Sequence, residues 1–522
     1  MNSYTLIGNR VYAPGVPDAQ ALMVENGHIV WIGDRHTALA LSSKEHQVIH
    51  LQDSFIAPGF VDAHVHLTAT GMHASSLQLQ NVRSFKELAD IVNEKFKSGH
   101  LDSEIFFGHG WDDANWSDSF DIFVSETEHV TCSIYLSRVD GHSAIIRHSA
   151  LGTEPQVVSG DQQNLFRKVL VENMDIRIRE HYISKALEQA ASQGVVAVHE
   201  NGGPIVSSEI DFQTTLKLGS HSNQPLVVGY WGDQDIDKAM ALGAQGAAGD
   251  FSVDGSLGSH SAFLTEPYAD HAGLCGKQYL DVDQIATHFI ESTRRGIQAG
   301  FHAIGDAALA AISEGLKKTL NSVSLAELRR CRHRLEHVEM PSKSDLETFA
   351  ECGIIVSVQP VFDEIWGDSN GMYHQRLGTN RYESMNPLND MLRLGVVMAF
   401  GSDSPVTPID PWRTIRAAIN HHQPWSRISA RAAFIAHTRG GWRASRDDIS
   451  GTLAIGAPAH IAVWDVREYV HDVPDERQQH WSTDIRSGTH PLPNLQTHTP
   501  ECVLTIRDGL PIFDPNQLLL ST

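Results

Sequence analysis

Two histidines, His64 and His66, close a short apolar segment that begins at Phe60. Side chains alternate along a β-strand, so residues two positions apart lie on the same face. The preceding Pro58-Gly59 is typical of a strand entered from a turn. Two imidazoles on one face at a strand end make half of a divalent-metal site. The alternative is a pair of ordinary histidines, one solvated and one hydrogen-bonded.

Further apolar runs also stop at polar side chains that could bind a metal. They end at His199-Glu200, Asp254, His302, His337 and Asp403. In a parallel barrel the catalytic groups lie at the carboxyl ends of the strands. Repeated endings of this kind favour a shared site, although for His199 alone a structural role is the stronger interpretation.

The strand-like runs of the middle region alternate with helix-like stretches. Eight βα units predict an α/β fold, a (β/α)8 TIM-type barrel. A doubly wound sheet competes, but no GxGxxG loop opens a helix here. Besides the run before His64, the predicted strands are 195–198, 226–229, 251–253, 299–301, 334–335, 353–356 and 396–400.

Both ends of the chain carry short β-like runs, and Asn26-Gly27 is a strong hairpin signal. Neither end has enough apolar residues for a core of its own. We therefore predict one small β-sandwich domain from residues 1–56 and 451–522. Residues 57–450 would form the barrel, with an insertion at about 67–180 that does not fit the repeat.

Composition narrows the function classes. The 522 residues carry a net charge of −23, which argues against nucleic acid or an anionic membrane as a partner. Five scattered cysteines without a CxxC motif indicate a reducing compartment. No signal peptide or membrane-spanning run is recognised. We expect a cytoplasmic enzyme with a small-molecule substrate, and a homodimer stays open. His421-His422 is interpreted as a solvated pair.

Several motifs together resemble the amidohydrolase superfamily, in the branch that includes N-substituted formamide deformylases. The similarity covers nearly the whole chain. The motifs are Pro58-Gly59-Phe60-Val61-Asp62-Ala63-His64-Val65-His66, Gly110-Trp111-Asp112, Asp140-Gly141-His142, Asp254-Gly255-Ser256-Leu257-Gly258-Ser259, His302-Ala303-Ile304-Gly305-Asp306, Arg334-Leu335-Glu336-His337 and Gly401-Ser402-Asp403-Ser404-Pro405.

The resemblance implies a metal centre at the barrel mouth. His64, His66 and Asp403 would bind a first ion, and His302 and His337 would bind a second or complete a single site. Zinc is the expected metal, with one or two ions, while iron or manganese would also fit. Relatives often carry a carbamylated lysine where this chain has Asp250, which is shorter, so the site could be mononuclear or bridged differently. Relatives also often have arginine in place of His260.

The implied activity is hydrolysis of a C–N bond in an amide-like substrate by metal-activated water. Asp403 would act as general base, and His142 or His199 would stabilise the oxyanion. Trp111, Asp112 and the nearby Trp116 would shape the substrate pocket, unless Trp111 only packs the insertion.

Two other classes stay open. One is a deaminase or lyase on the same centre, with Asp306 either an acid or a helix cap. The other is a non-catalytic scaffold.

Overall fold

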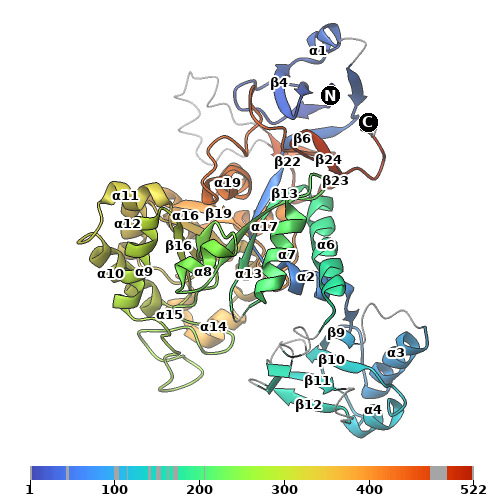
Figure 1. Ribbon diagram of the computed structural model, residues 1–522, viewed down its shortest axis with the longest axis vertical. Helices are drawn as coiled ribbons and strands as arrows, with labels where there is room; N and C mark the ends of the chain where they lie inside the picture. The colour runs from blue at the N-terminus through green and yellow to red at the C-terminus, as the bar shows by residue number, and fades with distance from the viewer. Residues whose placement is uncertain are drawn as a thin grey trace. The chain divides into compact units, whose positions relative to one another are not determined.

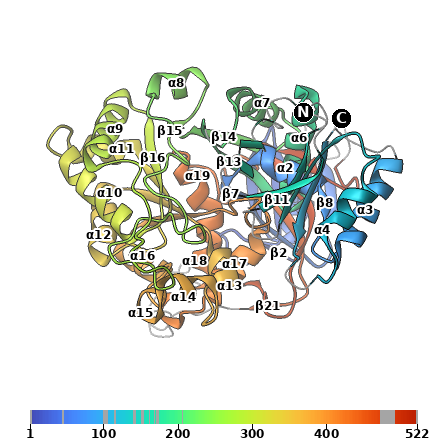
Figure 2. The ribbon, with the colours of Figure 1, turned by 90° about the horizontal axis from the view of Figure 1, so that it is seen from below.

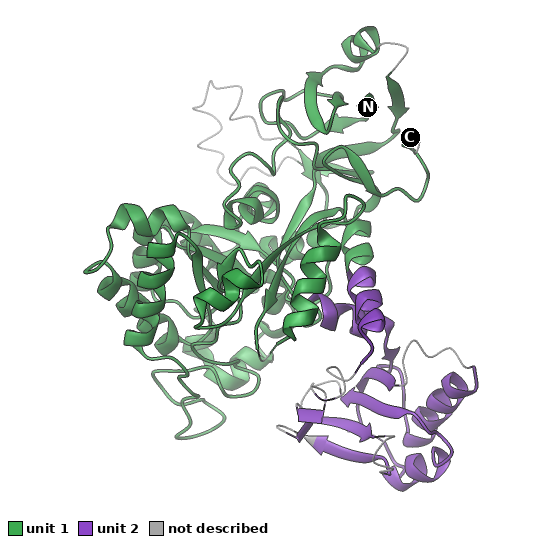
Figure 3. Ribbon diagram, in the orientation of Figure 1, with its two compact units in different colours: residues 1–66, 187–522 green, residues 67–186 purple. Residues whose placement is uncertain are grey.

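The computed structural model describes residues 3–42, 46–98, 105–113, 116–138, 143–148, 154–159, 174–204, 206–470 and 491–519, with five further positions between 162 and 169. The chain divides into two compact units (Figure 3). Unit 1 comprises residues 1–66 and 187–522, and unit 2 comprises residues 67–186.

Unit 1 contains a sheet of eight parallel strands. Every residue of β7 (Phe60–Val65), β13 (Val195–Gly202), β17 (Arg334–His337) and β18 (Ile355–Val358) is buried, as expected for parallel strands covered on both faces. The order is β19 (Val397–Phe400), β18 (Ile355–Val358), β17 (Arg334–His337), β16 (Gln298–Ala303), β15 (Gly246–Ala247), β14 (Leu226–Trp231), β13 (Val195–Gly202) and β7 (Phe60–Val65).

The first and last strands of this sheet meet and close it into a barrel. A parallel bridge joins Val65 to Ser404. Across the seam, the backbone N–H of Asp403 donates to the carbonyl of His64 over 2.8 Å. The N–H of His66 donates to the carbonyl of Ser404 over 2.9 Å. The predicted (β/α)8 barrel is confirmed.

The fourth strand differs from the prediction. The sequence favours 251–253, whereas β15 is the two-residue strand Gly246–Ala247, paired with Gln298 and Ala299. Gly249, with φ of +87°, turns the chain out of the sheet directly afterwards. Only Ser252 keeps a bridge, to His302. Asp250 therefore lies just beyond a strand end, and Asp254 lies further along the loop.

Helices follow the strands, and capping residues in the sequence mark where several of them begin and end. Asp281 and Gln284 form a capping box at the start of α9, and Gly296 ends it in the left-handed conformation. Figure 2 shows α9 to α12 along the outside of β15 and β16. The helices are α6 (Ile176–Ser192), α7 (Glu209–Gly219), α8 (Ile236–Ala241), α9 (Val282–Arg295), α10 (Asp306–Thr319), α11 (Leu325–Cys331), α12 (Lys343–Cys352), α13 (Pro360–Trp366), α14 (Met372–Leu377), α15 (Thr379–Tyr382), α16 (Leu388–Leu394), α17 (Pro411–Ile419), α18 (Ala430–Ile435) and α19 (Gly441–Ala444).

The two ends of the chain build a small β sandwich (Figure 1). One sheet has the order β4 (His28–Gly33), β3 (Ala21–Glu25), β1 (Ser3–Ile7) and β5 (Gln47–His50). The other has β2 (Arg10–Val11), β6 (Ser54–Pro58), β20 (Ile461–Asp465), β23 (Glu501–Arg507) and β24 (Leu510–Phe513). Leu6, Val24, Ile56, Val463 and Leu504 share one buried core between the sheets.

Hydrogen bonds from β23 join this sandwich to the barrel. One guanidinium nitrogen of Arg507 donates to the carbonyls of Gly219, His221 and Gln224, at 3.0, 3.0 and 2.6 Å. These carbonyls lie at and beyond the carboxyl end of α7, where backbone acceptors lack helical partners. Thr505 donates to the carbonyl of Ala191 over 2.7 Å. The terminal strands therefore support the barrel that carries the histidines.

Unit 2 has its own sheet and core. Its strands run in the order β12 (Gln156–Ser159), β11 (Ser143–Arg147), β10 (Ser133–Arg138), β9 (Ile105–Trp111) and β8 (Leu77–Gln78). Its helices include α2 (Leu67–Ser75), α3 (Phe85–Ser98) and α4 (Phe120–Glu126). Leu88, Phe123 and Ile134 pack together in its core.

All five cysteines are free thiols. Throughout the described ranges, every helix is too short or too polar to cross a bilayer.

Candidate metal centre

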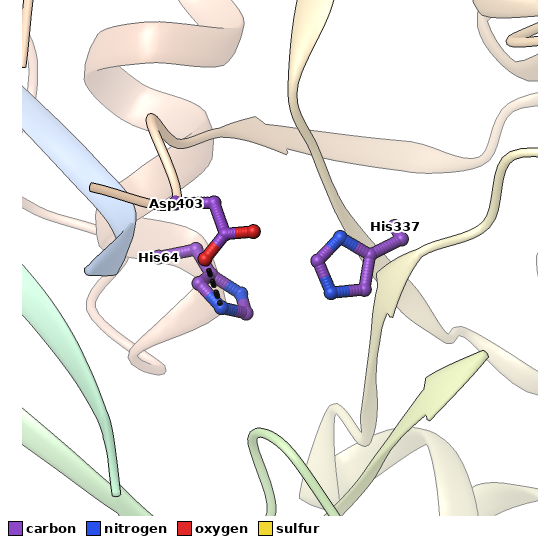
Figure 4. A group of neighbouring side chains, drawn as sticks. All are labelled: His64, His337 and Asp403. Carbon is purple, nitrogen blue, oxygen red and sulfur yellow. Dashed lines mark ion pairs between the residues drawn. The ribbon is translucent and has the colours of Figure 1, made fainter. Parts of the chain in front are cut away.

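Six side chains from the ends of five strands gather at one rim of the barrel. His64 and His66 come from the end of β7, and Asp250 follows β15. His302 lies in β16, His337 ends β17, and Asp403 follows β19. Parallel strands bring their carboxyl ends to the same side, so residues far apart in sequence meet there. Figure 4 shows Asp403 beside His64, with the ring of His337 across from them.

Asp403 contacts both histidines of the first strand. Its Oδ1 lies 3.3 Å from His64 Nε2 and 3.1 Å from His66 Nε2. Its backbone takes the left-handed conformation, with φ of +55°, which Asp adopts more readily than most residues. Gly401, two residues earlier, lies against the backbone of His64, where a Cβ would be only 2.6 Å from the His64 nitrogen. The seam therefore holds Asp403 close to the β7 histidines.

Asp250 reaches all four histidines despite its short side chain. Its Oδ2 lies 3.2 Å from His66 Nε2. Its Oδ1 lies 3.5 Å from His64 Nε2, 3.6 Å from His302 Nδ1 and 3.9 Å from His337 Nε2. One carboxylate therefore contacts both predicted pairs of histidines.

The donor atoms fit a divalent cation. Three overlapping sets each bring their ligand atoms within 4.8 Å of one another: His64, His337 and Asp403; His64, His66 and Asp250; and Asp250, His302 and His337. His64 Nε2 and Asp250 Oδ1 are both buried without a hydrogen-bond partner. Buried polar atoms of this kind normally have partners, and imidazole with carboxylate is a donor set that zinc and similar ions accept.

The Nδ1 atoms of His64, His66 and His337 each contact an oxygen outside the cluster. His64 Nδ1 lies 2.9 Å from Glu336 Oε2, and His66 Nδ1 lies 3.0 Å from the carbonyl of Asn201. His337 Nδ1 lies 2.9 Å from Gln359 Oε1. Such partners place the proton on Nδ1 and turn the Nε2 lone pair toward the centre, as in many metal sites.

The charged groups of the cluster shift one another's pKa values. Burial alone would lower the pKa of His66, but its contacts with Asp250 and Asp403 raise that pKa to about 10. Burial alone would raise the pKa of Asp403, whereas attraction by His64 and contacts with His64 and His66 lower it. The pKa of Asp250 is also lowered, against burial, mainly by His64. A cation that binds here takes the place of protons on these histidines.

The two carboxylates and His302 are partly exposed, whereas His64 is enclosed. The side chain of His64 is 0% exposed, whereas those of Asp403, Asp250 and His302 are 10, 14 and 16% exposed. The carboxylates can therefore meet solvent or a substrate while His64 remains enclosed.

The other predicted site residues that the structure describes have partners of their own. His199 is fully buried, and its Nδ1 lies 3.1 Å from a guanidinium nitrogen of Arg334. Trp111 is 1% exposed in the core of unit 2 and donates to the carbonyl of Leu136 over 2.7 Å. Asp112 pairs with Arg138. His142 lies outside the described residues. Catalytic and substrate-binding roles for these residues stay predictions.

Asp254 and Asp306, which belong to two of the sequence motifs, accept hydrogen bonds from backbone N–H groups. Asp254 is fully buried and accepts hydrogen bonds from the backbone N–H groups of Phe263, Ile304 and Gly305. It thereby fixes the loop that follows Asp250. Asp306 lies in the first turn of α10 and accepts from the N–H of Thr265 over 3.0 Å.

The residues behind the ligands were missed by the sequence interpretation. Arg334 and Glu336 are both fully buried and joined by an ion pair of 2.6 Å. Opposite charges two positions apart in one strand share one face, and this signal could have indicated a buried pair. Asn201 and Gln359 carried no comparable signal, because each partner lies on the neighbouring strand of the barrel and outside any short window of sequence.

Known proteins resemble this chain over most of its length. A model described as "Amidohydrolase family" matches residues 47–513. The chain is 26% identical over 514 residues to "Protein LONG AFTER FAR-RED 3" of Arabidopsis thaliana, covering 88% of this chain and 86% of that protein. It is 23% identical over 438 residues to "Putative amidohydrolase YtcJ" of Bacillus subtilis (strain 168), covering 77% and 80%. An uncharacterized metal-dependent hydrolase from Pyrococcus furiosus superposes with a TM-score of 0.73 at 25% identity, covering 89% of this chain and 99% of the other.

Proposed function

The chain belongs to the amidohydrolase family, and from this premise we propose that it is a metal-dependent hydrolase of a C–N bond in an amide-like small molecule. The observation that carries the proposal is the buried cluster of four histidines around Asp250 and Asp403 at the barrel rim. N-acyl and N-formyl amines are the substrate class to test first.

The six clustered side chains would hold the cation, and zinc is the expected ion. A bound divalent cation would supply electrophilic activation, which lowers the pKa of a coordinated water to about 7. We expect one ion. With the histidines neutral, the net charge of the cluster is −2, from Asp250 and Asp403. Glu336 adds nothing to it, because its charge is balanced by Arg334. One divalent cation balances that charge.

Metal analysis tests this part directly. Mass spectrometry of the purified protein should find one equivalent of a divalent metal per chain, and Asp250→Ala should lower that content. Two equivalents in the native protein would contradict the charge argument while leaving the hydrolase assignment in place.

Asp403 is the residue that we assign as general base. Its Oδ1 faces His64 and His66, so Oδ2 is the oxygen that would accept the proton of the attacking water. The same oxygen would then return the proton to the leaving nitrogen. Proton transfer of this kind contributes about 10²–10⁴-fold to the rate. The lowered pKa of Asp403 keeps this carboxylate ionised at neutral pH.

Asp403→Asn tests the assignment. We expect the variant to lose about 10²-fold or more of kcat, with the metal retained. Asp410→Asn is the matched control, because Asp410 lies in the same loop and caps α17. Asp403→Asn with bound metal and full kcat would refute the role of Asp403.

Product analysis separates the remaining reaction classes. Release of a carboxylic acid, or of formate, together with an amine supports amide hydrolysis, whereas ammonia from a ring amine supports a deaminase. A lyase would form an unsaturated product. A protein that binds no metal and turns over none of these compounds would favour the scaffold. The contacts of Asp250 with all four histidines argue for a retained ligand set.

A further inference from the structure

A single buried guanidinium lies behind the histidine cluster. Arg334 is 0% exposed, and its Nε and Nη2 donate to the two oxygens of Glu336 over 2.6 and 2.9 Å. Nη2 also donates to the carbonyl of Ala63 over 2.7 Å. The guanidinium carbon lies 4.1 Å from the ring centre of Tyr230, within the range of a cation–π contact.

The first consequence concerns His64. A carboxylate paired in this way with a guanidinium is ionised and can only accept hydrogen bonds. Glu336 Oε2 lies 2.9 Å from His64 Nδ1, so the proton of that contact belongs to Nδ1. Whenever His64 is neutral, its lone pair is therefore on Nε2, the atom that faces Asp250 and Asp403.

The second consequence concerns His199. Arginine has donors and no acceptor, so the contact of 3.1 Å from Arg334 Nη1 makes His199 Nδ1 the acceptor. The proton of this neutral ring is then on Nε2. His199 Nε2 is buried without a hydrogen-bond partner, so this N–H is a donor that the described protein atoms leave unused.

We propose that Arg334 is a positioning residue that fixes two histidines in opposite tautomers. Through Glu336 it presents His64 as a ligand at Nε2, and by direct contact it presents His199 as a donor at Nε2. The inference rests on the proposed function in one respect, which is that His64 is a metal ligand. Lysine cannot replace Arg334, because a single ammonium cannot reproduce the planar fork that serves Glu336, Ala63 and His199 at once.

Metal affinity provides the test without any substrate. We expect Glu336→Gln and Arg334→Lys each to raise the dissociation constant for Zn²⁺ by about 10–100-fold, measured by competition with a chelator. The double variant should lose little more than either single variant, because both changes break one chain of contacts.

Arg507→Lys is the matched control. Arg507 is also buried, binds three backbone carbonyls, and has no contact with the cluster among the described residues. We expect its Zn²⁺ affinity to stay within about threefold of the native value. A purely structural role for Arg334 would lower the stability of both arginine variants and leave Zn²⁺ affinity unchanged in both, and that result would overturn the proposal.

Neutron diffraction of native crystals tests the tautomers even if the variants fail to fold. We expect deuterium on His64 Nδ1 and on His199 Nε2. Deuterium on His199 Nδ1, or its absence from His64 Nδ1, would refute the inference. A native protein that binds no divalent cation would instead refute the proposed function, and the neutron map would still decide the tautomers.

Discussion

A methyl group at position 401 should damage the metal centre through the barrel seam. A Cβ on Gly401 would lie 2.6 Å from the backbone nitrogen of His64 and 2.8 Å from its Cβ. Ordinary van der Waals contact begins at 3.4 Å, so β19 and β7 would have to separate locally by about 0.8 Å. Asp403 follows two residues later, and its N–H donates to the carbonyl of His64 over 2.8 Å.

The cost follows from these contacts. Overpacking of a well-packed region costs about 1–3 kcal/mol, and loss of the seam hydrogen bond adds about 1 kcal/mol. We therefore expect Gly401→Ala to lower the free energy of unfolding by about 2–4 kcal/mol. A displacement of Asp403 by nearly 1 Å should also reduce kcat by about 10²-fold.

Urea unfolding, Zn²⁺ competition and steady-state kinetics measure these effects. Gly15→Ala is the matched control, because a Cβ there meets nothing within 4 Å. Neutral surface substitutions change the free energy of unfolding by no more than about 0.5 kcal/mol. If Gly401→Ala stays within that range and keeps the native Zn²⁺ affinity, the seam does not position Asp403.

Three further predictions concern pH, the sandwich and the metal. Burial lowers the pKa of His333 from 6.5 to about 3 in the folded protein. As the pH drops from 6.5 toward 3, His333 is protonated in the unfolded chain but not in the folded one, so the free energy of unfolding falls. His333→Gln should reduce that slope by about 1.4 kcal/mol per pH unit in urea titrations, and an unchanged slope would contradict it. Arg507→Met should lower the free energy of unfolding by about 3 kcal/mol, and Arg507→Lys by less; equal stability would show that the carbonyl contacts contribute nothing. Chelation should abolish hydrolysis and lower the melting temperature, and Zn²⁺ at 100 times its dissociation constant should restore about 2.7 kcal/mol; activity that survives chelation would exclude a catalytic metal.

The position of Asp250 changes how its substitution is interpreted. From the sequence, an aspartate at this position is shorter than a carbamylated lysine, so the site could be mononuclear or bridged differently. The structure places its two oxygens within 3.9 Å of four histidine nitrogens. Asp250 therefore contacts all four histidines from the loop that follows β15 (Gly246–Ala247), without the length of a carbamylated lysine.

Some sequence interpretations were wrong because they considered local pattern alone. His421 was interpreted as solvated, but it is 1% exposed and lies 3.5 Å from the buried Asp363. The predicted fourth strand at 251–253 failed because short apolar runs do not reveal which backbone groups pair across a sheet.

The sequence by itself determined the barrel, the sandwich and the types of side chain at the strand ends. Alternation along a strand is a local property and the repeated strand–helix pattern implies parallel strands, so His64, His66, His302, His337 and Asp403 could be assigned to one rim without coordinates. Capping residues such as Asp281 likewise fixed helix ends locally.

Tertiary structure alone decided how those side chains are supported. The contacts of Glu336 with His64 and of Arg334 with His199 join residues 272 and 135 positions apart. Long-range contacts of this kind depend on barrel closure and on desolvation of charge, which no short window of sequence contains. Residue type therefore specified the available chemistry, and the closed barrel specified which nitrogen of each histidine can perform it.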